Sequence, residues 1–251
     1  MQPLPLPWAF APSILVGILG AAGFYIAHAR RVGVDSRRAL FFWVGLGSFA
    51  VALVTPLDAA ADRYLLSAHM AQHILLTMIG PPLLLAGLPE GFARRLPRFL
   101  VNPWLGVFLF NTALLVWHIP ALYQATLYDE NIHLLEHVLF ITTAFVFWWP
   151  MVGPATAERP MSPLMKVGYL SLAAVPPTVI GVVMAFVPVE LYPFYSAVPR
   201  LFPAVSPSLD QQLAGIQMFG LGNFIYFAVA SWAFFQIAED DGAPDPLPAG
   251  N

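Results

Sequence analysis

The sequence predicts an all-α membrane protein, a polytopic bundle of seven transmembrane helices with its N-terminus outside and its C-terminus in the cytoplasm. The first observation is composition, because 59% of the 251 residues are hydrophobic, only 10% are charged, and mean hydropathy is +0.71. A soluble domain carries about 25% charged residues. The second observation is that apolar residues gather in seven runs, and the third is that lysine and arginine lie mostly between alternate runs.

Each run is close to the roughly 20 residues that an α-helix needs to cross a bilayer. Strands of a membrane β-barrel alternate in polarity over short segments, and these runs do not. No linker divides the chain, so we expect one transmembrane domain over residues 1–251, with short, loosely ordered ends at Met1–Pro7 and Glu239–Asn251. The expected spans are Pro12–Ala29, Ala39–Leu57, Leu65–Leu88, Val101–Ile119, Ile132–Met151, Pro163–Val187 and Leu209–Ile237.

The positions of the cations predict the orientation, since loops rich in lysine and arginine stay in the cytoplasm. Nine of the eleven fall on one side of the expected bundle. They are Arg30, Arg31, Arg37 and Arg38 after the first span, Arg94, Arg95 and Arg98 after the third, and Arg159 and Lys166 after the fifth. Only Arg63 and Arg200 fall on the other side. No cation precedes the first span, so we expect an uncleaved helix there and not a signal peptide.

Charge and composition exclude several classes of function. The net charge of −3 provides no basic surface for nucleic acid. Cysteine is absent, which excludes disulfides, thiolate metal sites and thiol redox chemistry. A retinal protein needs a lysine in mid-membrane, and the only lysine, Lys166, is expected at the inner edge.

Five of the six histidines are expected at one depth, near the outer face. Residues four apart share a helix face, so each of two H-x-x-x-H strings sets two imidazoles side by side. Spans three and five run inward from the outer face and span four ends there, which predicts a shared metal site. The candidate ligands are His69 and His73 in span three, His118 at the end of span four, and His133 and His137 in span five. His28 lies at the inner end of span one.

Other polar residues near the outer ends are possible accessory groups. Gln72 and Glu136 each precede the second histidine of a pair, where they could accept a ring N–H and fix its tautomer. Asp58 ends span two, and Asp210 begins span seven, where an N-cap is the alternative role. The thioether of Met218 would suit Cu(I), with core packing as its alternative.

The histidine pattern leaves the chemistry open. Imidazole suits zinc, copper, iron and nickel, while two histidines on facing helices could also hold haem b in an electron carrier. Histidines can equally serve as interhelical contacts, or as relays in a proton or solute transporter. The string H-x-x-E-H resembles an inverted zinc-protease motif, but no third ligand pattern accompanies it. We therefore expect a protein that is not an enzyme.

Four strings resemble the CtaG-like cytochrome c oxidase assembly factors of bacteria, those associated with caa-type oxidases. They are AHMAQHILLTMIGPPLLLAGLP, WHIPALYQATL, HLLEHVLFITTAFVFWWP and DQQLAGIQM, and the resemblance runs from span two through span seven. The last string departs slightly, with Phe219 where many members would have tryptophan.

The resemblance implies a multi-pass protein of the bacterial cytoplasmic (inner) membrane that helps to place copper in the oxidase. Its partners would be the oxidase subunit that carries the copper site, the lipid bilayer and, as a further possibility, a copper donor protein. The cofactor or cargo would be copper, and the family's histidines would carry over to the five outer-face histidines named above.

Overall fold

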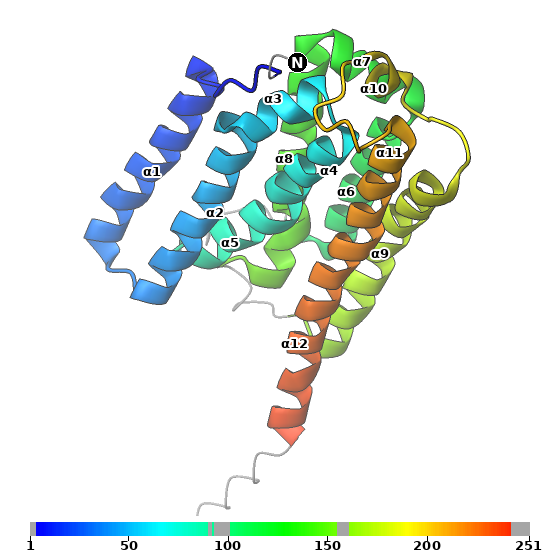
Figure 1. Ribbon diagram of the computed structural model, residues 1–251. Coiled ribbons are helices and arrows are strands. Elements are labelled where there is room, and N and C mark those ends of the chain that lie inside the picture. Colours follow the sequence, from blue (N-terminus) through cyan, green and yellow to red (C-terminus); the bar gives the residue numbers. More distant parts are fainter. Residues whose placement is uncertain (1–3, 90–91, 93–100, 155–160, 242–251) are drawn as a thin grey trace, which may run out of the picture.

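The computed structural model describes residues 4–89, 92, 101–154 and 161–241, and the regular elements in these ranges are all helical (Figure 1). Helix accounts for 81% of the residues that the structure describes, which confirms the all-α prediction. Within the described residues six helices are long and apolar enough to cross a membrane, and a bent pair of helices would make a seventh. Four of the cations used for orientation, Arg94, Arg95, Arg98 and Arg159, lie outside the described residues.

The helices follow one another with short connections. The first half contains α1 (Pro12–Val32), α2 (Ser36–Val54), α3 (Pro56–Arg63), α4 (Leu66–Ile74), the π-helical turn η1 (Leu75–Ile79), α5 (Gly80–Gly87) and α6 (Pro103–Trp117). The second half contains α7 (Pro120–Tyr128), α8 (Glu130–Val152), α9 (Pro163–Phe186), α10 (Pro193–Ala197), α11 (Pro207–Ile216), the π-helical segment η4 (Gln217–Gly222) and α12 (Asn223–Asp241).

The second span ends earlier than the sequence predicted. Helix α2 stops at Val54, and Pro56 starts the separate helix α3, since a proline is tolerated in a first turn but not in a helix interior. The Thr55 hydroxyl accepts a hydrogen bond from the Leu57 backbone N–H at 3.3 Å and caps α3. Pro56 and Leu57, which the sequence analysis assigned to the second span, therefore belong to a short helix at the upper end of the bundle in Figure 1.

The third span is continuous from Leu66 to Gly87 but widens into a π-turn at η1. Pro81 lies four residues beyond Thr77 and has no N–H to offer the Thr77 carbonyl. That carbonyl instead accepts a hydrogen bond from the Trp148 indole N–H of α8 at 2.8 Å. The proline thus accounts for the irregular turn, and the indole satisfies the buried group that it frees.

The fourth span, predicted as Val101–Ile119, is shorter in the structure, and an unpredicted helix follows it at a sharp bend. Helix α6 has 15 residues, about 22 Å at 1.5 Å per residue, which is less than the roughly 30 Å hydrocarbon core of a bilayer. It ends because Pro120 cannot continue the helix, and α7 leaves at an angle of 75°. His118 occupies this corner as the C-cap of α6.

The bundle places α4 in its interior, and α1 lies at one edge against α2 (Figure 1). Helices α9 and α11 approach closely at a pair of glycines: a Cβ on Gly215 would lie 2.5 Å from the Gly181 carbonyl oxygen. Small residues allow such approach between membrane helices. The last turn of α1, with Arg30 and Arg31, and the first turn of α2, with Arg37, lie at the opposite end of the bundle from α3, α7 and α10 (Figure 1).

Candidate metal centre

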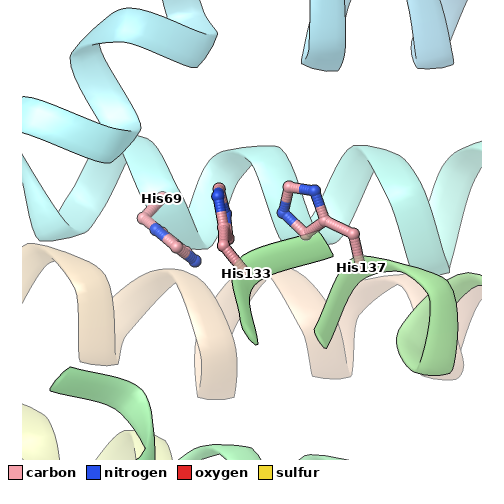
Figure 2. Close-up of side chains that lie close together, drawn as sticks. All are labelled: His69, His133 and His137. Carbon is pink, nitrogen blue, oxygen red and sulfur yellow. The ribbon is translucent and has the colours of Figure 1, made fainter. Parts of the chain in front are cut away.

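Four histidines from two helices meet near the upper end of the bundle. His69 and His73 lie on one face of α4, and His133 and His137 lie on one face of α8. Figure 2 shows the rings of His69, His133 and His137 close together, with those of His133 and His137 arising from α8. Ring centroids of His133 and His137 are 4.2 Å apart, and His69 lies 5.6 Å from His133. The sequence prediction that the two strings face each other agrees with this geometry.

Both histidine helices begin at a carboxylate cap. The Asp129 side chain accepts hydrogen bonds from the backbone N–H groups of Asn131 and Ile132, which starts α8 just before His133. Helix α4 has no cap from its own N-cap residue, Leu65. A cap satisfies backbone N–H groups of the first turn that otherwise lack partners, and so fixes the residue at which the helix begins. The positions of the histidines in the next turns are thereby fixed as well.

Asp210 supplies the missing cap of α4 from another helix. Its two carboxylate oxygens accept hydrogen bonds from the Leu66 and Ser67 backbone N–H groups at 2.8 and 3.0 Å, and one oxygen also accepts from the Ser67 hydroxyl. The sequence had offered Asp210 as a possible ligand or as the N-cap of its own span. In the structure Ser206 caps α11, and Asp210 ties the start of α11 to the helix that carries His69.

Glu136 is the acidic member of the cluster. Its side chain is fully buried, and its two oxygens lie 3.9 Å from the Nε2 atoms of His69 and His73. Those two Nε2 atoms are 2.9 Å apart. Nitrogens that each lie 2.0–2.1 Å from a tetrahedral metal ion are separated by about 3.3 Å. Shifts of a few tenths of an ångström would therefore let His69, His73 and Glu136 hold one ion.

Two overlapping sets of ligand atoms fit a metal ion, each within 4.8 Å. One comprises His69, His133 and His137, and the other His69, His73 and Glu136. Several of these groups are buried without a hydrogen-bond partner among the described residues: Nδ1 of His73, Nε2 of His133, Nε2 of His137 and both oxygens of Glu136. Unpaired buried polar atoms are costly, so their concentration at one place fits a site built for a cation.

A tyrosine that the sequence interpretation missed orients His69. The Tyr195 hydroxyl, from α10, donates a hydrogen bond to the Ala61 carbonyl at 2.9 Å, so its oxygen is left to accept. His69 Nδ1 lies 3.4 Å from that oxygen and donates to it, which leaves the Nε2 lone pair facing His73 and Glu136. Such partners fix the tautomer of a metal-binding imidazole. No spacing in the sequence relates position 195 to position 69.

Helix α3 places two carboxylates beside the histidines. Asp62 Oδ1 lies 3.7 Å from His133 Nε2, and Asp62 was missed although it follows Asp58 by one helical turn. Burial, together with the negative charge of Asp62, raises the pKa of Asp58 to about 6. Burial raises the pKa of Asp62 to about 7. Asp62 is partly exposed and lies between the surface and the histidines.

Gln72 does not hydrogen-bond a ring nitrogen, contrary to the sequence hypothesis. Its Nε2 donates to the Ala52 carbonyl and to Asp58 Oδ1, both at 2.9 Å. The reason is helical geometry, because neighbouring residues are about 100° apart around a helix and Gln72 faces α2 and α3. Glu136 does face the imidazoles, as described above.

His118 and Met218 lie apart from the two ligand sets. His118 is not a member of either set of histidine and carboxylate ligand atoms. His118 and Met218 both line a small cavity that His73 also borders. Of the five histidines that the sequence predicted as ligands, four therefore lie in one cluster, and His118 lies beside a neighbouring cavity.

A model of the cytochrome c oxidase caa3 assembly factor family (Caa3_CtaG) matches residues 21–240, most of the chain. The chain belongs to this family. The match confirms the resemblance drawn from the four strings. This Caa3_CtaG member therefore belongs to a family of cytochrome c oxidase assembly factors. The searches of curated proteins and of solved structures returned no match.

Proposed function

We propose that this protein binds copper through the histidine cluster and delivers it to the copper site of a cytochrome c oxidase, as a chaperone and not as an enzyme. The observation that carries the proposal is the meeting of four imidazoles and a buried, unpaired carboxylate at the facing ends of α4 and α8. Family membership supplies the link to oxidase assembly.

The donor set supports copper over the alkaline earth ions. Calcium and magnesium prefer six or more oxygen ligands, whereas the cluster offers mostly imidazole nitrogen. Copper, zinc and iron all accept imidazole, and the absence of cysteine leaves histidine and methionine as the soft ligands of this chain. Among metals that suit imidazole, copper is the one that a factor for a haem–copper oxidase would carry.

The distribution of charge supports delivery on the extracytoplasmic side of a bacterial inner membrane. Arg30, Arg31, Arg37 and Arg38 lie at the end of the bundle opposite the histidines (Figure 1), and cytoplasmic loops are the ones enriched in such residues. In the proposed orientation the N-terminus would lie outside, the C-terminus in the cytoplasm and the cluster close to the outer surface. The partner would be the membrane subunit of the oxidase that receives copper.

The geometry disfavours the two alternatives. A haem needs a large pocket, yet the cavity that His73 and His118 border is about 50 Å³, against the 300–1,000 Å³ of common small-molecule sites. A transporter needs polar groups through its depth, but α6 and α8 pack against each other through Phe110, which lines the cavity, and through Phe147 and Trp148.

The proposal is tested on the oxidase itself. Oxidase would be purified from cells that carry the wild-type factor or the His69→Ala/His137→Ala variant, and its copper-to-haem ratio measured by elemental mass spectrometry. We expect the variant to lower the copper content by more than about tenfold, the scale at which metal sites respond to lost support. His28→Ala is the matched control, since His28 lies against Phe24 and Phe92 far from the cluster. Oxidase with its full copper complement in the variant would contradict the proposal.

A further inference from the structure

A small cavity lies directly inward of the histidine cluster. Its volume is about 50 Å³, and its wall includes three methionines and two histidines: Met70, Met78, Met218, His73 and His118. All five side chains are buried. A water molecule needs about 10–15 Å³ of such space, so the cavity has room for a single metal ion but not for an organic cofactor.

His118 presents a ligand atom that has no partner. Its Nδ1 lies 2.8 Å from the Leu114 carbonyl oxygen, which can only accept, so Nδ1 carries the proton. Nε2 is then an unprotonated lone pair, buried and without a hydrogen-bond partner among the described residues. Donation of the other N–H to a backbone carbonyl is the usual support of a metal-binding histidine. The bend at Pro120 holds this ring at the corner between α6 and α7.

The methionines come from segments whose backbones are irregular. Met78 lies in η1 and Met218 in η4, the two π-helical segments of the described chain, and both border this cavity. Single π-turns in membrane and soluble helices are frequent at functional sites. A thioether is a soft ligand that selects Cu(I) over harder ions. Three thioethers and an imidazole with an unpaired nitrogen therefore line one small cavity.

We propose that this cavity is a second, separate Cu(I) site formed by thioethers and the His118 imidazole. His73 borders both sites, because its Nε2 faces His69 and Glu136 while its ring lines the cavity. His73 therefore connects the cluster and the cavity. The inference deepens the proposed function, on which it rests for the identity of the metal.

The test is the ligand shell of Cu(I) in the full-length protein. Detergent-purified protein would be loaded under argon with Cu(I) as its acetonitrile complex, and copper K-edge X-ray absorption would report sulfur neighbours. We expect a sulfur shell in wild-type protein and its loss, with loss of part of the bound Cu(I), in Met70→Leu/Met78→Leu/Met218→Leu, which removes all three thioethers of the cavity. Met184→Leu is the matched control: Met184 is fully buried in the same apolar cluster but does not line the cavity. Visible absorption of added Co(II) would report whether the imidazole cluster stays intact.

Copper bound by nitrogen and oxygen alone in wild-type protein overturns the second site, and so does a sulfur shell that survives in the triple variant or disappears in Met184→Leu. The wild-type spectrum decides the question even where a variant fails to fold. The proposed function fails separately: if cells lacking the factor make oxidase with normal copper, delivery is refuted, whereas a sulfur shell in the purified protein still establishes the site.

Discussion

Replacing Glu136 with glutamine should change stability and metal binding in opposite directions. Both carboxylate oxygens are buried without a hydrogen-bond partner and face two imidazoles at 3.9 Å. A buried unsatisfied polar group costs about 1–3 kcal/mol, and more when it is charged. The glutamine amide is neutral, and its N–H groups can donate to the neighbouring imidazole nitrogens, so Glu136→Gln should raise the free energy of unfolding of the metal-free protein by about 1–3 kcal/mol.

The metal-bound state should suffer from the same change. Loss of an anionic ligand should weaken metal binding by about 100-fold, the upper end of the effects that outer-shell residues produce. At a fixed metal concentration well above the dissociation constant, that loss removes about 2.7 kcal/mol of metal-induced stabilisation. Thermal unfolding in detergent, with and without Cu(I), measures both effects.

Glu130→Gln is the control for this experiment, because Glu130 is an exposed carboxylate in the first turn of the same helix. It should leave both the metal-free stability and the metal-induced shift unchanged. A Glu136→Gln protein that is less stable without metal, and that keeps the wild-type shift with metal, would refute the interpretation of Glu136 as a ligand held at a cost in stability.

Three further substitutions test the residues around the cluster. Asp210→Ala removes a charged cap from α4 and should lower the free energy of unfolding by about 3 kcal/mol, because hydrogen bonds to charged groups contribute about 1.5–3 kcal/mol each. Thermal unfolding measures this loss, and an unchanged melting temperature would rule out the cap. Tyr195→Phe keeps the ring but removes the oxygen that orients His69, and should weaken metal binding about 10–100-fold in a chelator competition; wild-type affinity would contradict that role. The folded-state pKa of Asp58, about 6 against an ordinary 3.8, means that the folded protein holds a proton the unfolded chain has lost. Stability should therefore fall as pH rises from about 4 to 6, and Asp58→Asn should flatten this part of the pH profile.

The sequence predicted most of the fold because hydrophobic length alone identifies a helix that crosses lipid. The bounds of α1, α8 and α9 differ from the predicted spans by a few residues. Helix α7, which begins just beyond the predicted end of the fourth span at Ile119, was missed, since its nine residues are too few to be recognised by hydropathy as a helix that crosses the bilayer. The π-helical turns were also missed, because they depend on which distant side chain, such as Trp148, reaches the freed carbonyl.

The four clustered histidines could be predicted because i, i+4 spacing and alternating span direction place them at one depth on a shared face. The sequence did not separate His118 from them, since that separation depends on the bend between α6 and α7. Tyr195 and the capping role of Asp210 depend on contacts between segments more than 120 residues apart, which no local pattern encodes. Asp62 had a local signal, its spacing from Asp58, that pointed to the correct face of α3.

Copper in the purified protein is the most direct test of the central claim. Wild-type protein and the His69→Ala/His137→Ala variant would be isolated from copper-replete cells and analysed by elemental mass spectrometry. Wild-type protein should carry about one or more copper ions per chain, and the variant should lose the copper held by the imidazoles of α4 and α8. Copper-free wild-type protein, or equal copper in both proteins, would contradict the claim.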